Sequence, residues 1–507
     1  MHLLATFQNA PIHRAKYNGI SIARVLLAIG AAVLFAIESN TSCHAEADLT
    51  ANSANELTLH WKCSTQSSQW VDKSDVSTSG SVSIPTSERA LILVDSKRRQ
   101  QAIDGWGGCF NERGWKAMES LSSDERDHLM RSLFDAKDGL NLNLCRVPIG
   151  ASDYAITLYS LDETPGDYSL EHFSIERDKE RLIPYIKAAL ALRPDMKLWA
   201  VPWSPPSWMK KSNSLQGKTT IPNEIKDDDK TLDALALYFA RFVQAYKAAG
   251  VNIGMVMPQN EPNVDSNYTS CLWTGEQLAK FIGYHLGPIL KKEGLDTPIF
   301  LGTLNDSKRG GYAYWVAPSM QDVKVRPYLA GVGCQWGADI TMSETHFLFP
   351  DLKLIQSEAE CGKTNSNDWA FGEHQYQLAK KWFNAGASVN TVWNLVLDET
   401  GLSTANWAQC SPVVVDTKSK KVTYTPYYYC YKHFSYFIQP GAHLIATQST
   451  WNDRVAFVNP DGEVVVVLAN TTANDQPIAL NIDGRQSEVV DLPAHSFNTF
   501  TMPPVSR

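Results

Sequence analysis

Two glutamates follow apolar stretches of the sequence, in positions from which they could do acid–base chemistry. Glu261 lies near the end of "NIGMVMPQNEP" (252–262), and Glu358 lies near the end of "LKLIQSEAE" (352–360). Two carboxyl groups about 5 Å apart across a cleft can cleave a glycosidic bond, because one attacks the anomeric carbon while the other protonates the leaving oxygen. Their mutual repulsion raises one pKa and keeps that group protonated. The alternative is that one or both are ordinary loop carboxylates, or ion-pair partners of Arg146.

Eight short apolar runs alternate with longer helical patterns and would position these glutamates. Each run is nearly continuously apolar rather than alternating, which is typical of parallel strands covered on both faces. Eight strand–helix units predict an α/β fold, a (β/α)8 TIM barrel, and a doubly wound open sheet is the alternative. The runs are 103–110, 142–150, 197–206, 252–262, 298–305, 329–336, 352–360 and 388–398.

Helix-capping residues stand between these runs. Ser123, Thr231 and Thr274 each precede a helical pattern and are expected to be N-caps. Gly250 follows the second of these patterns and is expected to end that helix, because glycine readily adopts the left-handed conformation found there.

The active site of such a barrel lies at the carboxyl ends of its strands. Polar and aromatic residues near the ends of the runs are therefore the candidates for the site. Strands four and seven, which carry Glu261 and Glu358, are expected to face each other across the barrel mouth. The candidates are Asp104, Arg146, Asp153, Trp203, Asn260, Glu261, Gln335, Trp336, Glu358, Glu360 and Trp393.

The two ends of the chain have a different character from the barrel segment. Both contain short β-like runs separated by Ser, Thr, Asn, Asp and Gly, which predicts an antiparallel β-sandwich built from both ends against the barrel. The expected divisions are a signal peptide (1–45), N-terminal strands of the sandwich (46–98), the catalytic barrel (99–432) and the C-terminal sandwich (433–507).

The first 45 residues resemble an export signal. Basic residues precede an uncharged run of 13 residues, 25–37, which is too short to span a membrane. Cleavage near Ala45 would leave a secreted or periplasmic protein with no stable membrane insertion, and an uncleaved anchor is the alternative. The basic residues are His13, Arg14, Lys16 and Arg24.

Composition narrows the range of partners. A net charge of −8 argues against nucleic acid and anionic membrane surfaces. No two cysteines have the Cys-x-x-Cys spacing of a zinc site, so we expect neither a metal nor another cofactor. Cys145 lies inside an apolar run and is expected to be a buried thiol. We expect a monomer.

Six motifs, in order and on successive predicted strands, together resemble glycoside hydrolase family 30, which includes glucosylceramidases and endo-β-glycanases. The resemblance runs from about residue 100 to the end and implies a barrel with a side β-sandwich. The motifs are "GWGGCFNERGW", "NLCRVPIGASDY", "VPWSPPSWMK", "MPQNEPN", "IQSEAECG" and "VWNLVLDETGL".

The resemblance implies a role for individual residues. Glu261 matches the family's acid/base, and Asn260 matches an asparagine that holds the sugar 2-hydroxyl. Glu358 matches the nucleophile, and Arg146 matches an arginine that keeps it ionised. No catalytic role is expected for Glu360. Matches to residues that line the glucose subsite are Asp153, Trp203 and Trp393.

One motif departs from the glucosylceramidase pattern. Those enzymes carry His-Trp-Tyr near the end of strand six, where this chain has "CQWG" (334–337), with Gln335 and Trp336. Bacterial members that act on β-1,6-linked glucans are more similar here. The acidic loop "DETGLSTANWAQC" (398–410) argues against a glucuronoxylanase, since it offers no basic residue for a glucuronic acid group.

These observations favour an exported, metal-independent retaining β-glycosidase whose substrate is a β-glucan or β-glucoside, with β-1,6-glucan first. Glucosylceramide and small β-glucosides are the alternatives within the enzyme class. A non-catalytic carbohydrate-binding protein is the alternative of another class, although it would be expected to have lost at least one of Glu261, Glu358, Asn260 and Arg146.

Overall fold

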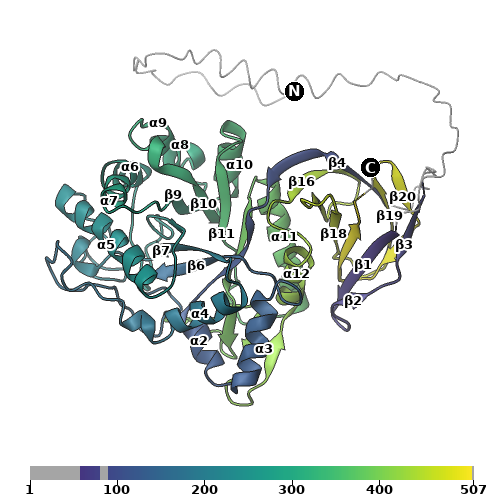
Figure 1. Cartoon of the computed structure of the whole chain (residues 1–507), viewed down its shortest axis with the longest axis horizontal. Coiled ribbons are helices and arrows are strands. Elements are labelled where there is room, and N and C mark those ends of the chain that lie inside the picture. The colour runs from purple at the N-terminus through teal and green to yellow at the C-terminus, as the bar shows by residue number, and fades with distance from the viewer. Residues whose placement is uncertain (1–57, 80–89, 505–507) are drawn as a thin grey trace, which may run out of the picture. The chain divides into compact units, whose positions relative to one another are not determined.

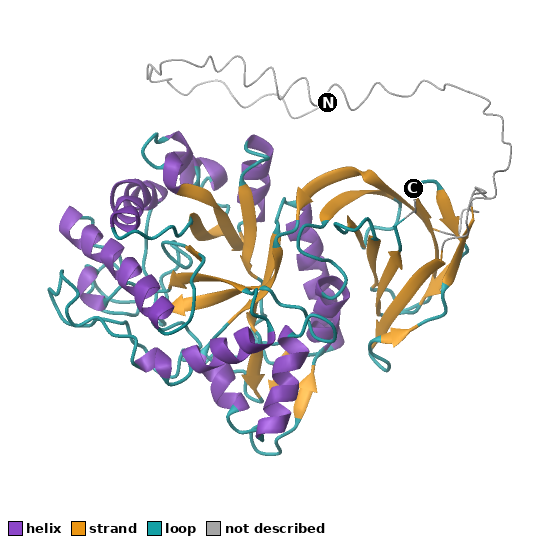
Figure 2. Cartoon of the chain, in the orientation of Figure 1, coloured by secondary structure: helices purple, strands orange, loops and turns teal. Residues whose placement is uncertain are grey.

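The computed structural model describes residues 58–79 and 90–504, which belong to one compact unit (Figure 1). The segment predicted to be an export signal lies outside the described residues. An eight-stranded parallel barrel surrounded by helices and an eleven-stranded sheet make up most of this unit (Figure 2).

The predicted barrel is confirmed, and all eight apolar runs contain its strands. The sheet closes between β11 and β12, where the backbone nitrogen of Ser388 donates to Leu354 at 2.7 Å and that of Ala359 donates to Thr391 at 2.8 Å. Closure excludes the open sheet. In hydrogen-bonding order the strands are β11 (Lys353–Glu358), β10 (Leu329–Gly337), β9 (Ile299–Asp306), β8 (Met255–Val256), β7 (Lys197–Pro202), β6 (Leu144–Ile149), β5 (Gly105–Cys109) and β12 (Val389–Asn394).

The helices pack their apolar faces on the outside of the barrel and form its main hydrophobic core. They are α2 (Glu112–Met118), α3 (Ser123–Phe134), η1 (Arg177–Lys179), α4 (Leu182–Leu192), η2 (Ser207–Met209), α5 (Asp229–Ala248), α6 (Gly275–Lys280), the π-helix η3 (Phe281–Leu286), α7 (Gly287–Lys292), α8 (Gly311–Trp315), α9 (Ala317–Gln321), η4 (Arg326–Tyr328), α10 (Asp339–Leu348), α11 (Trp369–Asn384) and α12 (Pro426–Ser435). A small three-stranded sheet joins β13 (Val396–Asp398), β14 (Val413–Val415) and β15 (Val422–Tyr424).

Two of the three predicted N-caps are wrong by a few residues. Ser122, not Ser123, caps α3, because Ser122 has extended backbone and its side chain accepts from the backbone of Glu125. Asp228, not Thr231, caps α5, and Thr231 instead donates its backbone N–H to the Asp228 carboxylate at 3.0 Å. The observed caps thus lie one and three residues before the predicted ones.

The other two helix-end predictions are confirmed. Thr274 caps α6, and the side-chain oxygen of Gln277 accepts from the backbone N–H of Thr274 to complete a capping box. Gly250 follows α5 with φ of 83°, the left-handed conformation that ends helices.

The sandwich draws its strands from both ends of the chain, as predicted. Its pairing path also returns on itself, because β3 pairs with β1. In order the strands are β2 (Val71–Asp72), β1 (Thr58–Thr65), β22 (Ser496–Met502), β18 (Val464–Asn470), β17 (Arg454–Val458), β16 (His443–Gln448), β4 (Ala90–Ala102), β19 (Gln476–Ile482), β20 (Arg485–Ser487) and β3 (Val76–Ser79), with β21 (Val490–Leu492) beside β19.

One pair in the sandwich contradicts the antiparallel prediction. β4 and β19 run parallel, with Ala90 opposite Ile478. These strands come from opposite ends of the chain, so no hairpin constrains them to run antiparallel.

A buried histidine joins the barrel helices to the sandwich. His433 on α12 contacts Thr499 Oγ1 on β22 through Nδ1 at 2.8 Å and Ser64 Oγ on β1 through Nε2 at 2.9 Å. Burial, and then the positive charges of Lys62 and Lys432, lower the pKa of His433 to about 3. The ring is therefore neutral when it makes these contacts.

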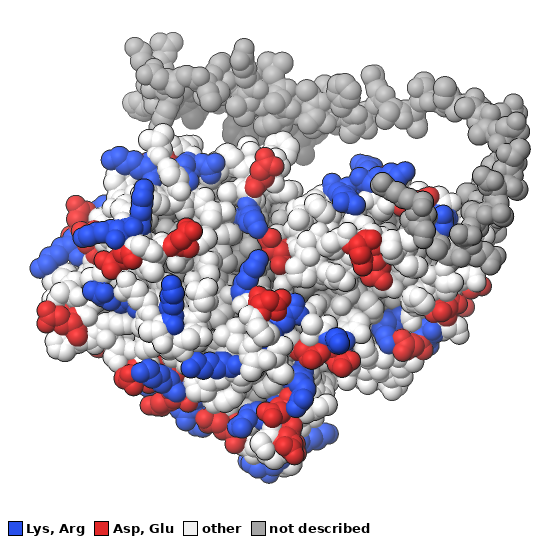
Figure 3. All heavy atoms as spheres, in the orientation of Figure 1, with Lys and Arg blue, Asp and Glu red and all other residues white. Residues whose placement is uncertain are grey.

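The described cysteines are all buried free thiols, and burial raises the pKa of Cys145 to about 12, as expected for a thiol inside a strand. Within residues 58–79 and 90–504, no helix is long and apolar enough to cross a membrane. On the face shown in Figure 3, basic and acidic side chains are interspersed.

Candidate active site

A cavity of about 650 Å³ opens at the carboxyl ends of the barrel strands. Seven of the predicted site residues line it, and Arg146 and Gln335 lie fully buried behind its wall. Two strands, β9 and β10, separate β8 from β11, so Glu261 and Glu358 approach the cavity from strands three positions apart, one short of directly opposite in an eight-stranded barrel. The lining residues are Asp153, Trp203, Asn260, Glu261, Val264, Tyr268, Asn305, Trp336, Glu358, Gly362, Lys363, Trp393, Trp407 and Gln409.

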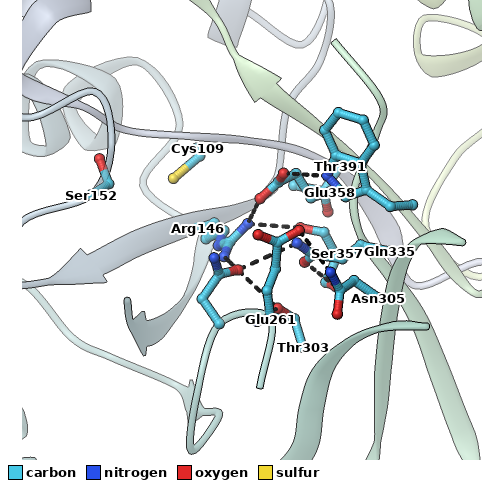
Figure 4. Close-up of polar contacts among 12 residues, drawn as sticks. Cys109, Arg146, Ser152, Glu261, Thr303, Asn305, Gln335, Ser357, Glu358 and Thr391 are labelled. Atoms are coloured by element: carbon cyan, nitrogen blue, oxygen red, sulfur yellow. Dashed lines mark hydrogen bonds and ion pairs between the residues drawn. The ribbon is translucent and has the colours of Figure 1, made fainter. Parts of the chain in front are cut away.

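Glu358 is the last residue of β11, and both of its carboxylate oxygens have strong donors (Figure 4). Oε2 accepts from Nη1 of Arg146 at 2.5 Å, and Oε1 accepts from the indole Nε1 of Trp336 at 2.7 Å. The side chain is only 6% exposed. An ion pair and a second hydrogen bond therefore hold this buried carboxylate in one orientation.

Arg146 is the cation of the site and lies in the middle of β6 with no exposed surface. While Nη1 binds Glu358, Nη2 donates to Oδ1 of Asn260 at 2.5 Å. The guanidinium carbon lies 4.2 Å from the ring centroid of Trp203, in a cation–π contact. One fixed guanidinium thus connects the carboxylate of β11 with the loop that follows β8.

The orientation of the Asn260 amide follows from its neighbours. Besides Arg146, Oδ1 accepts from Oγ1 of Thr303 at 2.9 Å and from Nε2 of Gln335 at 3.3 Å. Only the oxygen of an amide can accept three donors, so Nδ2 must point the other way. Within the described chain Nδ2 has no hydrogen-bond partner, which leaves this donor for a sugar hydroxyl.

Glu261 is held differently from Glu358. It follows β8 with φ of 48°, a conformation that is uncommon for any residue but glycine, and its side chain faces the cavity. Oε1 accepts from Nδ2 of Asn305 at 3.2 Å, and Oε2 accepts from the hydroxyl of Tyr268 at 2.9 Å. Both donors are neutral, and no cation lies among its direct hydrogen-bond partners.

The pKa of Glu261 is raised to about 7, mainly by desolvation and then by the negative charge of Glu358. Hydrogen bonds from Tyr268 and Gln335, and the charge of Arg146, act in the opposite direction but do not cancel these effects. A proton-carrying carboxyl group and an ion-paired carboxylate therefore share one cavity near neutral pH.

The remaining predicted residues form one wall of the cavity. Trp203 and Trp393 stack with ring centroids 5.1 Å apart. Asp153 is 5% exposed, and burial, together with the charges of Glu358 and Glu261, raises its pKa well above the ordinary value. Its backbone oxygen accepts from the amide and hydroxyl of Thr404, which fixes the backbone at this residue.

Two candidates lie outside the cavity. Asp104 precedes β5 and so belongs to the amino ends of the strands, where it binds Nζ of Lys353 at 2.8 Å and the hydroxyl of Ser388. Glu360 turns away from the cavity and pairs with His374 and Lys381 on α11. The choice of Asp104 as a candidate was wrong because it lies near the start, rather than the end, of its apolar run (103–110).

Five polar or aromatic lining side chains were not predicted from the sequence. Asn305 ends the fifth apolar run, so the rule that selected the other candidates could have found it. Tyr268 lies in a loop seven residues after Glu261, where no sequence pattern distinguishes it. Longer loops supply the other three, Lys363, Trp407 and Gln409.

The arrangement suits cleavage of an acetal by two carboxyl groups. Glu358 is held as an anion, and Glu261 carries a proton that it can give and take back near neutral pH. The cavity also offers aromatic faces for sugar C–H groups and free polar atoms for hydroxyls. The described residues contain no cluster of three or more His, Cys, Asp or Glu that could bind a metal ion.

Fold and site together define a hydrolase of glycosidic bonds on a TIM barrel with a side β-sandwich. Residues 103–438 match the Glycosyl hydrolase family 30 TIM-barrel domain, and residues 441–500 match the Glycosyl hydrolase family 30 beta sandwich domain. The chain belongs to glycosyl hydrolase family 30, and it is a glycoside hydrolase.

Glucosylceramidases and endo-1,6-β-glucanases are among the proteins that this chain is similar to. The mouse Lysosomal acid glucosylceramidase is 30% identical over 423 residues, which cover 77% of this chain and 79% of that protein. Endo-1,6-beta-D-glucanase neg1 of Aspergillus fumigatus is 27% identical over 435 residues, which cover 81% and 88%. The solved structure "The endo-beta1,6-glucanase BT3312" is 25% identical, with a TM-score of 0.75 over 88% of this chain and all of that one.

Proposed function

We propose that this protein is a retaining β-glycosidase in which Glu358 is the nucleophile and Glu261 is the acid/base. The observation that carries this proposal is the contrast between the two carboxyl groups: Glu358 is paired with Arg146, whereas desolvation and the charge of Glu358 raise the pKa of Glu261 to about 7. An anion suits attack on carbon, and a proton held near neutral pH suits transfer to a leaving oxygen.

The reaction proceeds in two steps. In the first, the Glu358 carboxylate attacks the anomeric carbon, while Glu261 gives its proton to the departing oxygen, and a covalent glycosyl-enzyme forms. In the second, Glu261 removes a proton from water as the water attacks the same carbon, which releases the sugar and regenerates both carboxyl groups. Two inversions give overall retention of configuration.

Neighbouring residues bind the sugar in this proposal. The free Nδ2 of Asn260 donates to the 2-hydroxyl, and the Asp153 carboxyl group accepts from hydroxyls on the far side of the ring. Trp203 and Trp393 offer stacked rings to the sugar's C–H faces. Arg146 keeps Glu358 and Asn260 in register.

A β-1,6-linked glucan is the proposed substrate, and two observations support it. Endo-1,6-β-glucanases are among the relatives over more than four-fifths of the chain. The cavity lining also includes the polar side chains of Lys363, Gln409 and Asn305 beside its aromatic residues. Such polar groups can bind the hydroxyls of a glucan leaving group.

Products from a substrate panel test this assignment. Pustulan, laminarin, xylan, glucosylceramide and an aryl β-glucoside would each be incubated with the wild-type protein and with Glu358→Gln as the inactive control. We expect gluco-oligosaccharides from pustulan at the highest kcat/KM. Preferred cleavage of glucosylceramide would show that this glycolipid, and not β-1,6-glucan, is the substrate. Tight glucan binding without any released reducing sugar would indicate a non-catalytic binding protein.

We also propose that the protein is exported, on the evidence of the basic residues and the apolar run 25–37. Amino-terminal sequencing of the mature protein tests this, with a new terminus near Ala45 expected. An intact Met1 on protein recovered inside the cell would contradict it.

A further inference from the structure

A second pocket, of about 400 Å³, lies on the outside of the barrel beside the sandwich. It is formed by α3, α12 and the turn that precedes β2, which lie together in the lower centre of Figure 1. It shares no residue with the active-site cavity. Its volume falls in the range of about 300–1,000 Å³ that is typical of small-molecule sites. Its lining includes Trp70, His128, Arg131, Tyr424, Tyr428 and Tyr429.

The floor of this pocket is aromatic and rigid. The ring of Tyr428 lies 4.8 Å from that of Tyr424 and 5.3 Å from that of Tyr429, measured between centroids. Tyr428 is buried, and its hydroxyl donates to the backbone oxygen of Ser132 at 3.0 Å, which fastens α12 to α3. Tyr424 and Tyr429 are only half-buried, so they offer ring surface to a ligand.

Trp70 adds a fourth aromatic side chain from the sandwich. Its φ of 57° is left-handed, a conformation that a bulky residue keeps only when its surroundings enforce it. The backbone nitrogen of Trp70 donates to Oγ of Ser64 at 2.9 Å, and its ring packs on Tyr436 at 5.2 Å. Both contacts hold Trp70 at the pocket.

The rim supplies polar groups of both charges. Asp135 and Asp138 are balanced by Arg131 and by Lys432, whose Nζ donates to the backbone oxygen of Asp138 at 2.6 Å. The exposed side chains of His128 and Arg131 make no hydrogen bond or ion pair with any residue the structure describes. Mixed charge favours a neutral, hydroxyl-rich ligand over an anion, since either sign of ligand charge would meet repulsion.

We propose that this pocket is a second, non-catalytic binding site for a neutral glycan chain, which keeps the polymer on the enzyme between cleavages. Tyrosine and tryptophan faces stack on the C–H faces of pyranose rings, and the free rim groups bind hydroxyls. The identification of this glycan as a β-1,6-glucan rests on the proposed function. The preference for a neutral glycan rests on the pocket residues alone.

Electrophoresis in native gels that contain pustulan tests the site, with the full chain carrying Glu358→Gln so that the polymer stays intact. Tyr429→Ala and Arg131→Ala are added separately to this parent, and Tyr284→Ala, which removes an exposed tyrosine from η3, is the matched control. We expect the parent and the Tyr284→Ala variant to be retarded alike, and each pocket variant to bind pustulan at least fivefold more weakly.

The same substitutions in the active protein separate this site from the active site. Tyr429→Ala should leave kcat/KM for an aryl β-glucoside unchanged and raise KM for pustulan. Unchanged retardation of both pocket variants, or absence of retardation in the parent, would overturn the second site while pustulan hydrolysis still supported the function. Conversely, if pustulan were bound through Tyr429 but not hydrolysed, the site would stand and the proposed substrate would fall.

Discussion

Tyr268 and Glu261 form the contact that most directly controls the proton of the site. The Tyr268 hydroxyl donates to Oε2 of Glu261 and so stabilises the charged form, against the stronger effects of desolvation and of Glu358. The acid must be protonated in the first step, so kcat/KM should fall as pH rises through the Glu261 pKa of about 7.

Tyr268→Phe should move this alkaline limb to higher pH. Removing a donor to the charged form raises the Glu261 pKa, so the protonated acid persists further into the alkaline range. The measurement is the pH profile of kcat/KM on an aryl β-glucoside with a poor leaving group, and Tyr284→Phe is the control with an exposed tyrosine. A limb that stays in place or moves to lower pH would remove Tyr268 from this role.

The protein should need both the charge and the planar shape of Arg146 for full stability and activity. Arg146→Leu leaves the Glu358 carboxylate buried without a counter-charge, so we expect a loss of about 3–5 kcal/mol of unfolding free energy and no turnover. Arg146→Lys keeps the charge but cannot hold Glu358 and Asn260 with one planar group, so it should be more stable than the leucine variant yet still poorly active. Urea unfolding and initial rates measure both effects.

Substitutions at Glu358 test whether its carboxylate is the nucleophile. Glu358→Gln should abolish turnover of an aryl β-glucoside, and azide should not restore it, because the amide fills the space of the nucleophile. Glu358→Ala leaves room for azide, which should restore turnover and give the α-glycosyl azide. Near-wild-type activity in the glutamine variant would sink the assignment.

Residues at strand ends were predictable because a continuous apolar run locates a strand, and its last residues then face the barrel mouth. Glu261 and Glu358 were found in this way, whereas Asp104 was chosen from the start of its run (103–110), which corresponds to the opposite end of the strand. Tyr268 and Trp407 escaped prediction because long loops, not strand ends, bring them to the cavity.

Elements were more predictable than their boundaries. β8 has only two paired residues, Met255 and Val256, although its run spans 252–262. After Val256 the ladder becomes irregular but stays bonded to both neighbouring strands. The backbone nitrogen of Asn260 donates to Pro202 on β7 at 2.8 Å, and that of Glu261 donates to Thr303 on β9 at 3.1 Å. This irregular extension of the strand places Asn260 and Glu261. The predicted cap positions were also displaced. Ser122 and Asp228 can cap the same helices, and residue propensity alone does not show which of two nearby candidates will be the N-cap.

The junction between α12 and the sandwich should make the protein sensitive to acid. The pKa of His433 is lowered from the ordinary histidine value of 6.5 to about 3. Between these two pH values the histidine is protonated in the unfolded chain but neutral in the folded chain. Its contribution to stability is therefore complete above pH 6.5 and declines as pH falls toward 3. The loss should be about 1.4 kcal/mol per pH unit.

His433→Gln should remove this part of the acid sensitivity. Between pH 7.5 and 5.0 the wild type should lose about 2 kcal/mol more unfolding free energy than the variant. Urea unfolding at the two pH values measures the difference, and His172→Gln, at an exposed histidine, is the control. If wild type and His433→Gln lost the same amount, the buried ring would not be the sensor.

The fold of the whole molecule could be predicted because one pattern, an apolar run followed by a helix, repeats along the sequence. Eight continuous apolar runs with helices between them admit few folds, and both a barrel and a doubly wound sheet cover their strands on both faces. The hydrogen bonds between β11 and β12 distinguish the barrel. The parallel pairing of β4 with β19 could not be foreseen, because strands from opposite ends of the chain carry no turn that reports their direction. The substrate is equally hidden, since loops around the cavity select it.

The division of labour between two carboxyl groups is the central claim, and trapping the covalent intermediate tests it most directly. The wild-type protein would be inactivated with a 2-deoxy-2-fluoro-β-glucosyl fluoride, digested, and mapped by mass spectrometry. We predict one fluoroglucosyl group per chain, attached to Glu358. A label on Glu261 or Glu360, or inversion of the anomeric centre without any covalent adduct, would contradict the account.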